Sequence, residues 1–188
     1  MEIGPVSIFF AGLAGGLLGW TLLEYVIHAW LGHLPKGKIL TSREHLAHHV
    51  DILYFTPFAL KVRGAIPVLA GVLAGVSAAF GLPAGIGATS GVAVGWTIYE
   101  VVHQSIHVNG PRSAWSRWAA RHHLEHHFRN PRANHGVTTP IWDLLLGTHV
   151  PVRRVKVPAR AVKSLPWLER ALAAGSRPGF LADYEIGA

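Results

Sequence analysis

The chain has 188 residues, enough for one domain with a substantial core, and half of them are hydrophobic while only 14% are charged. It contains no cysteine, which excludes disulfides, thiolate metal sites and cysteine nucleophiles and leaves its 13 histidines, its carboxylates and the backbone as metal ligands. The formal net charge is +7, and the basic residues lie between and after long apolar runs. That arrangement favours a membrane surface over a nucleic acid as the partner.

The first apolar run, residues 3–23, carries no charge and is long enough to cross a bilayer core. No basic segment precedes it and its helical pattern continues unbroken, so we interpret it as a retained transmembrane helix and not as a secretory signal. Just beyond it, Glu24 and His28 share a helix face, and His33 follows five residues later. Ionisable groups so close to an apolar span are functional candidates. Glycines in the run have spacings that allow close helix packing: Gly12, Gly15, Gly16 and Gly19.

A second uncharged run, residues 64–99, is too long for one helix. Its break at residues 81–85 (GLPAG) predicts a helical hairpin, with one arm near residues 65–80 and the return near residues 84–102. A re-entrant hairpin and a hairpin in a soluble core are the alternatives, but uncharged runs of this size favour the membrane. Glycines recur every four residues on the return arm and predict a packing stripe: Gly87, Gly91 and Gly95.

Histidines cluster after these apolar runs. Two triplets of the form His-x-x-His-His, in residues 45–49 and 123–127, each predict imidazoles that converge on one helix face. Glu100, His103 and His107 form a similar stripe at the end of the return arm. One such cluster could be a solvated face, but two favour a metal site of neutral imidazoles. Two metals with four or five imidazoles each account for ten positions: His28, His33, His45, His48, His49, His103, His107, His123, His126 and His127.

A short internal repeat supports this arrangement of apolar runs followed by histidines. Residues 19–24 read GWTLLE and residues 95–100 read GWTIYE, and each is followed by two spaced histidines and a triplet. The repeat predicts two half-units that meet at a shared site, with a chance likeness between two glycine-rich helix ends as the alternative. Basic residues fall in the segments at the histidine-bearing end, and positive loops stay cytoplasmic. We therefore expect the histidines at the cytoplasmic rim of the membrane.

Residues 134–149 predict an ordered turn that leads into a short helix. There Asp143 could accept a hydrogen bond from a ligand histidine and fix its tautomer, or it could cap the helix. The remainder is basic, and residues 164–174 predict a short amphipathic helix with Trp167 and Leu168 at the membrane interface. The last residues predict a tail without a site.

Together these motifs resemble the fatty acid hydroxylase/sterol desaturase superfamily of integral-membrane di-iron enzymes, over roughly residues 19–148. The resemblance implies an all-α fold. An integral-membrane helical bundle of about three to four membrane helices, with a cytosolic histidine-rich lobe, would occupy residues 1–150, and a basic, amphipathic tail residues 151–188. It also implies that the ten histidines are the metal ligands. It rests on Glu24-Tyr25-x-x-His28 with His33, His45-x-x-His48-His49, His103-x-x-x-His107, His123-x-x-His126-His127-Phe128, Asn134-x-Gly136-Val137-Thr138, Trp142-Asp143 and Gly147-Thr148.

Members of this superfamily insert oxygen into a lipid chain, or remove hydrogen from it, with dioxygen and electrons from a redox partner. The resemblance therefore implies two iron ions, which zinc could replace in a purified form. It implies a lipid substrate (fatty acyl, sphingolipid, sterol or isoprenoid) and a separate electron donor of ferredoxin or cytochrome b5 type. The positive loops favour the cytoplasmic membrane as the location, with the histidines on its cytoplasmic side. Three carboxylates would orient the ligands: Glu24, Glu100 and Asp143. Two histidines are additional ligand candidates: His122 and His135.

Two departures from the superfamily pattern weaken any assignment of substrate: His135 stands where members often carry an aromatic residue, and Val108 where some carry another histidine. Hydroxylation and desaturation are both open, because the outcome depends on the exact position of the substrate. A membrane metal-binding or transport protein is the alternative of another class. It would need ionisable groups along a path through the bilayer, and residues 3–23 and 64–99 carry none.

Overall fold

The computed structural model describes residues 4–175 and 179–187. The first residue of the predicted N-terminal span and a few residues of the predicted tail lie outside these ranges. The chain divides into two compact units. Unit 1 comprises Met1–Glu24 and Thr56–Tyr99, and unit 2 comprises Tyr25–Phe55 and Glu100–Ala188.

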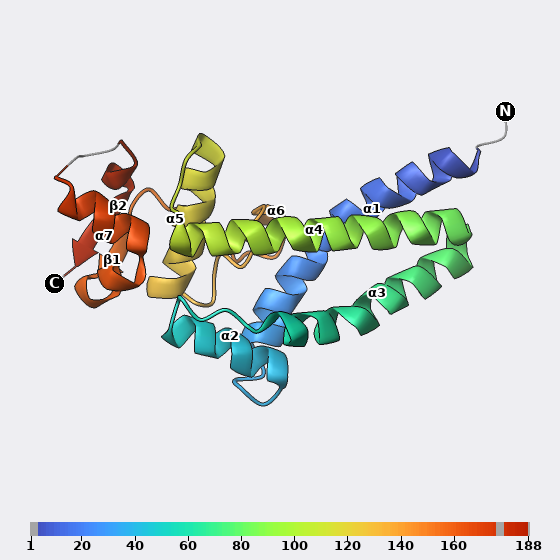
Figure 1. The fold of residues 1–188 in the computed structure, drawn as a ribbon, viewed down its shortest axis with the longest axis horizontal. Helices are drawn as coiled ribbons and strands as arrows, with labels where there is room; N and C mark the ends of the chain where they lie inside the picture. Colours follow the sequence, from blue (N-terminus) through green and yellow to red (C-terminus); the bar gives the residue numbers. More distant parts are fainter. Residues whose placement is uncertain (1–3, 176–178, 188) are drawn as a thin grey trace. The chain divides into compact units, whose positions relative to one another are not determined.

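The fold is mostly helical, as the sequence predicts (Figure 1). One correction to the all-α class is needed, because β1 and β2 pair in parallel with Val155 opposite Tyr184. The elements in chain order are α1 (Pro5–Tyr25), the π-helix η1 (Val26–His33), α2 (Leu40–Val50), α3 (Phe58–Phe80), α4 (Leu82–Val108), α5 (Ala114–Phe128), α6 (Ile141–Leu145), β1 (Val155–Pro158), the 3₁₀ helix η2 (Ala159–Ser164), α7 (Pro166–Ala173), the 3₁₀ helix η3 (Gly179–Asp183) and β2 (Tyr184–Gly187).

Two helical stretches in the described residues are long and apolar enough to cross a membrane: Pro5–His33 and Phe58–Phe80, with mean hydropathies of 1.8 and 1.7. The most apolar window of the second has no buried residue. Such a helix in water would expose a large apolar surface, whereas lipid suits it. The predicted hairpin is present as α3 and α4, which turn at Gly81 with φ +87°. The number of spans remains a prediction.

Glycines bring α1 and α4 into close contact within unit 1. A Cβ on Gly16 would lie 2.1 Å from the carbonyl oxygen of Ala88, and one on Gly91 would lie 2.2 Å from that of Leu13. Such distances are shorter than atomic contact, so only glycine allows this approach. The predicted packing is confirmed for five positions: Gly12, Gly16, Gly87, Gly91 and Gly95. At two other glycines, an added Cβ would meet nothing outside its own helix within 4 Å among the described residues: Gly15 and Gly19.

Unit 2 is built around α5, the helix that carries the second triplet. Its N-terminus is fixed by a reciprocal capping box between Ser113 and Ser116. Its Ala119, Ala120 and Leu124 are fully buried and allow neighbouring elements to approach closely. The middle of α5 is therefore a packing surface, and its C-terminal half carries the imidazoles.

The C-terminal segment packs on α4 and α5 within unit 2. The predicted amphipathic helix is present as α7, but Trp167 and Leu168 are buried in the protein, which corrects their expected place at the membrane interface. The Trp167 indole N–H donates to the carbonyl oxygen of Ile106 at 2.9 Å. The Asp183 carboxylate accepts hydrogen bonds from the guanidinium groups of Arg117 at 2.9 Å and Arg121 at 2.8 Å. The predicted tail is therefore a folded part of the unit.

Candidate metal centre

Five imidazoles from three elements of unit 2 converge in a first group, cluster 1. Their ligand atoms all lie within 4.8 Å of one another, and neighbouring Nε2 atoms are 2.8–3.1 Å apart. The η1 helix contributes two of these residues, α2 contributes two, and α5 contributes one. Cluster 1 consists of His28, His33, His45, His49 and His126.

A second group, cluster 2, collects the other five predicted ligands within the same limit of 4.8 Å. The Nε2 atom of His123 lies 3.1 Å from that of His107 and 3.0 Å from that of His127. The two clusters are neighbours, because the ring of His49 in cluster 1 stacks on the ring of His127 in cluster 2 with centroids 4.2 Å apart. Cluster 2 consists of His48, His103, His107, His123 and His127.

The structure divides each triplet between the clusters, which corrects the expectation that its three imidazoles meet in one volume. On α2, His45 and His49 point to cluster 1 and His48 to cluster 2. On α5, the outer pair points to cluster 2 and His126 to cluster 1. Residues four apart on an α-helix differ by about 40° in direction, whereas residues three apart differ by about 60° to the opposite side. The i, i+4 pair therefore stays together and the intermediate residue reaches the neighbouring cluster.

The π-helix explains how His28 and His33 reach the same cluster. Five residues on an ordinary α-helix rotate the side-chain direction by about 140° off the starting face. In a π-helix, with its i→i+5 hydrogen bonds, residues five apart lie one above the other. Residues Val26–His33 adopt this wider helix, so both imidazoles face α5 and approach the Nε2 atom of His126, each at 3.0 Å.

Backbone carbonyl groups determine which ring nitrogen faces inward. The Nδ1 atoms of His28 and His126 lie 2.5 and 2.8 Å from the carbonyl oxygens of His135 and Ala133. A carbonyl only accepts, so each Nδ1 must carry the proton, and each neutral ring then presents an Nε2 lone pair. These two Nε2 atoms lie 3.0 Å apart, a contact that two lone pairs cannot form without a cation between them. In cluster 2 a carbonyl group supports His48 in the same way, because the Nδ1 of His48 donates to the carbonyl oxygen of Tyr54 at 2.8 Å.

Burial keeps these rings neutral. It lowers the pKa of His126 well below the ordinary value, and the nearby imidazoles of His28 and His49 lower it further. Burial likewise lowers the pKa of His49 to about 3, and that of His127 well below its usual value. A neutral imidazole is the form that binds a metal, so both clusters are prepared as donor sets without first losing protons.

The donor sets fit a metal ion. Imidazole nitrogens about 2.1 Å from one metal, at right angles around it, lie about 3 Å apart. The observed 2.8–3.1 Å separations agree with this spacing. Five donors exceed the four of a tetrahedral structural zinc site, and an all-imidazole shell suits iron, copper or zinc.

Asp143 acts on cluster 1 indirectly. Its buried carboxylate accepts hydrogen bonds from the backbone N–H groups of His135 and Gly136, both at 2.8 Å, and from the Thr148 hydroxyl at 2.7 Å. The His135 carbonyl on this loop orients His28. A Cβ on Gly136 would lie 2.1 Å from the Thr139 carbonyl oxygen, so the loop requires glycine there.

The hydrogen bonds of Asp143 correct one alternative of the prediction, the helix cap, and leave its support of a ligand histidine as a prediction. The carboxylate does accept a hydrogen bond from a histidine, but the donor is His122, at 3.2 Å, which lies outside both clusters. Asp143 lies inside α6, whose N-cap is Pro140, so it does not cap that helix. Burial alone would raise the pKa of Asp143, but these hydrogen bonds hold it below the ordinary value, and the carboxylate stays charged.

The other candidates lie outside the two clusters of the described residues. His135 is buried, and its ring centroid is 5.2 Å from that of His126, close to cluster 1. His122 stacks on Trp118. Glu24 is buried near the end of α1, and Glu100 is half-buried on α4. A role for either glutamate beside the metals remains a prediction.

No residue type in the sequence marks the carbonyl groups that orient these imidazoles, because every residue has one. The sequence did carry a weaker signal at Asn134, which has φ +58°, a conformation that asparagine tolerates better than most residues. Its side chain forms two hydrogen bonds to the backbone of Val150. The loop that presents the carbonyl groups of Ala133 and His135 is thereby locked.

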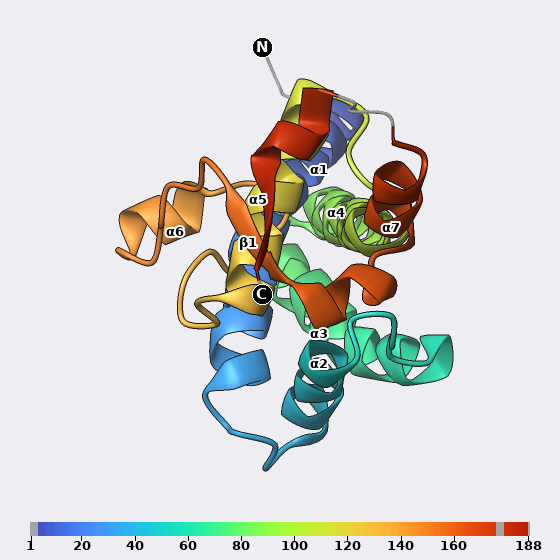
Figure 2. The same cartoon turned by 90° about the vertical axis from the view of Figure 1, so that its left-hand side faces the viewer.

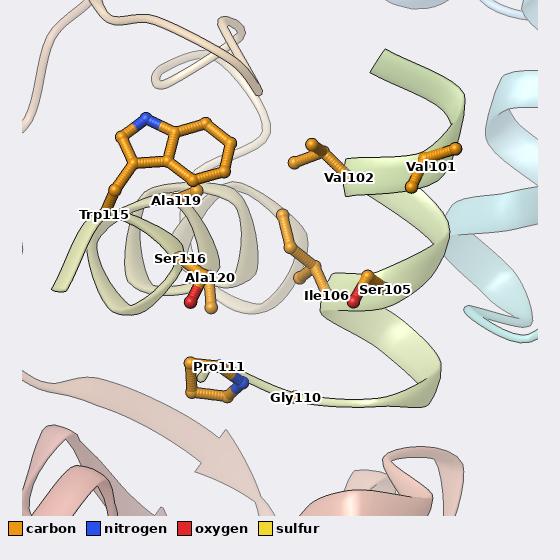
Figure 3. Close-up of a pocket in the computed structure, with 10 residues that line it drawn as sticks. All are labelled: Val101, Val102, Ser105, Ile106, Gly110, Pro111, Trp115, Ser116, Ala119 and Ala120. Atoms are coloured by element: carbon orange, nitrogen blue, oxygen red, sulfur yellow. The ribbon is translucent and has the colours of Figure 1, made fainter. Parts of the chain in front are cut away.

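An apolar pocket of about 140 Å³ lies between α4 and α5 (Figure 3). Val102 and Ile106 line it from α4, and Trp115 and Ala119 from α5. Ala119 lies one helical turn before His123. The pocket is smaller than the roughly 300–1,000 Å³ of ordinary ligand sites, so it does not hold a whole lipid chain by itself.

A helical fold with apolar spans and two adjacent clusters of five imidazoles defines a candidate dimetal protein of the membrane-enzyme type. The family profile of the fatty acid hydroxylases matches residues 13–148. The chain therefore belongs to the fatty acid hydroxylase family, which confirms the resemblance seen in its motifs.

Named relatives agree with this family. The dihydroceramide fatty acyl 2-hydroxylase FAH2 of Arabidopsis thaliana is 31% identical over 145 residues, which are 72% of this chain and 59% of that protein. The fatty acid 2-hydroxylase of Rattus norvegicus is 27% identical over 159 residues, 78% of this chain and 41% of that protein. This chain thus spans about two-fifths to three-fifths of the length of these relatives. A solved structure, full-length scs7p with only its hydroxylase domain visible, is similar with a TM-score of 0.62 and 25% identity, over 78% of this chain and 56% of that one.

Proposed function

We propose that this chain is a membrane-bound dimetal oxygenase that hydroxylates the hydrocarbon chain of a lipid. The contact between the His28 and His126 Nε2 atoms carries the proposal, because two inward lone pairs 3.0 Å apart call for a bound cation. Each cluster offers five imidazoles to its own ion, and the clusters touch where the ring of His49 stacks on the ring of His127. The ten clustered histidines are the proposed ligands.

Iron is the proposed metal of both clusters, although zinc would fit the same donors. Two bound iron ions would supply dioxygen activation, so that one oxygen atom enters a C–H bond while the other leaves as water, with two electrons and two protons consumed. The protein's own part is to hold the ten imidazoles in place. The carbonyl groups of Ala133, His135 and Tyr54 do so for three of them, and Asp143 secures the loop that carries the first two.

The proposed substrate is a fatty acyl chain, free or within a sphingolipid, hydroxylated beside its carbonyl group. This choice follows the relatives, which are named fatty acid and dihydroceramide fatty acyl 2-hydroxylases. It favours hydroxylation over desaturation, which would leave a double bond in place of a hydroxyl group. The metal-transport alternative gains no support, because the clustered imidazoles lie beyond the uncharged segments of the sequence.

The electrons would come from a separate redox protein of ferredoxin or cytochrome b5 type. The proposed location is the cytoplasmic membrane with the histidines on its cytoplasmic side. The distribution of Lys and Arg in the segments next to the histidines supports this orientation.

The test is a mass-spectrometric lipid profile of cells that express the chain under ¹⁸O₂. We expect a fatty acyl species that gains one ¹⁸O atom. His126→Ala should abolish this product and lower the metal content, because it removes the central nitrogen of cluster 1. His149→Ala is the matched control, since His149 belongs to neither cluster. A labelled product that persists in the His126→Ala cells would refute the ligand assignment, and a product with two fewer hydrogens and no ¹⁸O would make the protein a desaturase.

A further inference from the structure

The short helix α6 and its C-cap residue, Leu146, expose a group of large aliphatic side chains. The exposed fractions are 47% for Ile141, 59% for Leu144, 67% for Leu145 and 49% for Leu146. Figure 2 shows α6 projecting beside α5, on the side away from α7. The intervening Asp143 is fully buried, so α6 is held to unit 2 by its polar residue while its apolar residues face outward. A surface helix of a soluble protein normally buries its apolar residues and exposes its polar ones, which is the opposite of what α6 does. Exposed groups of large apolar side chains mark an interaction surface.

The charges around α6 indicate which partner fits. Between Arg132 and Arg153, the only Asp, Glu, Lys or Arg is the buried Asp143. Exposed arginines border this uncharged segment on both sides: Arg129, Arg132, Arg153 and Arg154. An apolar surface bordered by cations matches a bilayer whose acyl chains lie beneath anionic head groups. A protein partner would not in general explain why arginines flank the apolar segment on both sides.

Hydrogen bonds connect α6 to the end of a candidate membrane helix. The Thr148 hydroxyl donates to Asp143 at 2.7 Å and lies 3.1 Å from the hydroxyl of Tyr25, the last residue of α1. The 21 residues of α1 rise by about 30 Å, which equals the thickness of a bilayer core. If α1 crosses the bilayer, Tyr25 lies at its surface, the level that tyrosine favours. The short connection through Thr148 brings α6 to the same level.

We propose that α6 and its C-cap Leu146 dock on the lipid bilayer and insert their four exposed aliphatic side chains among the acyl chains. The expected depth is roughly 5–10 Å into the boundary between head groups and acyl chains, as for other interfacial helices. Asp143 then links the lipid surface to cluster 1, because the same carboxylate holds the loop whose His135 carbonyl orients His28. This lipid contact is a property of the surface and does not depend on hydroxylation.

Site-directed spin labelling tests the proposal directly, because the chain has no native cysteine and each introduced cysteine is labelled alone. The full chain carrying Leu145→Cys, and separately Leu144→Cys, is reconstituted into nanodiscs of phosphatidylcholine and phosphatidylglycerol. Collision rates of the nitroxide with oxygen, which partitions into lipid, and with a water-soluble nickel complex are then measured. Lys156→Cys, an exposed position on β1, is the control.

We expect the oxygen-to-nickel collision ratio at positions 144 and 145 to be several times that at position 156. A nickel accessibility at both α6 positions equal to that of the control would overturn the proposal. So would labels protected from both colliders, and spin–spin broadening between labels would then identify a second copy of the chain as the occupant. The lipid product is measured separately on the unlabelled chain, so a failure of the docking proposal leaves the proposed function standing.

Discussion

Replacing Asp143 with asparagine should weaken metal binding at cluster 1 selectively. One carboxylate oxygen accepts from the His135 N–H and the Thr148 hydroxyl, and the other from the Gly136 N–H and His122. In either orientation of the amide, its NH₂ group would face one of these backbone N–H groups. An NH₂ group is a donor, so it cannot accept that hydrogen bond. Losing one buried hydrogen bond to a charged group costs about 1.5–3 kcal/mol.

That energy sets the expected effect on affinity. The backbone N–H group that loses its acceptor belongs to His135 or to Gly136. The carbonyl group of His135 accepts the hydrogen bond from the Nδ1 atom of His28. If the full cost reaches cluster 1, its metal affinity falls by about 10–100-fold, the range common for groups that support a ligand. Cluster 2 has carbonyl support from Tyr54, which Asp143 does not hold, so its affinity should fall much less.

The assay is a competitive titration of the purified full chain with Zn²⁺ and a chromophoric chelator, with and without Asp143→Asn. Repeating it in a His127→Ala background, where cluster 2 lacks one ligand, identifies the cluster that has weakened. Asp183→Asn is the matched control, because Asp183 is also a buried carboxylate of unit 2 but contacts Arg117 and Arg121 instead of the loop. Equal losses at both clusters, or no loss at either, would refute the reasoning.

Three further outcomes are expected. Gly91→Ala should destabilise the packing of α1 and α4 by about 1–3 kcal/mol in thermal unfolding, because its Cβ meets the Leu13 carbonyl, whereas Gly75→Ala, with nothing within 4 Å among the described residues, should not. Burial opposes ionisation of Asp183, but hydrogen bonds from Arg117 and Arg121 hold its pKa below the ordinary value. Its contribution to stability should therefore be complete above about pH 4 and be lost as the pH falls further, and Asp183→Asn should remove this dependence from acid unfolding curves. Removing the metals with a chelator should lower the unfolding temperature, since metal at 100 times its Kd stabilises the folded chain by about 2.7 kcal/mol per site, and an unchanged temperature would contradict two bound ions.

The sequence predicted most of the helical fold because its signals are local. Long uncharged runs gave the apolar helices, the GLPAG segment gave the hairpin turn, and glycine spacing gave the contact between α1 and α4. The parallel pairing of β1 with β2 was missed, because the two four-residue strands are separated by 25 residues and carry no periodic pattern long enough to detect. The burial of Trp167 was also missed, since an amphipathic helix presents the same pattern to protein as to lipid.

The candidate site likewise could be predicted from local sequence signals only in part. All ten histidines named from their spacing lie in the two clusters, but the spacing did not show which cluster each one joins. His33 illustrates the reason: its position beside His28 depends on the hydrogen-bond pattern of a π-helix, which residue types alone do not reveal. The carbonyl groups that orient the imidazoles depend on the path of the backbone and have no residue type to mark them.

Because each histidine triplet is divided between the two clusters, α2 and α5 connect the clusters mechanically. The adjacent residues His48 and His49 on α2 serve different clusters, and so do His126 and His127 on α5. A helix moves as a rigid element, so a shift of α2 or α5 that improves the geometry of one cluster must also displace ligands of the other. Metal binding at one cluster should therefore change the affinity of its neighbour, so the two sites should be thermodynamically coupled. A Zn²⁺ titration in which the His126→Ala variant binds its remaining ion as tightly as the intact chain binds its last ion would show that the clusters are independent.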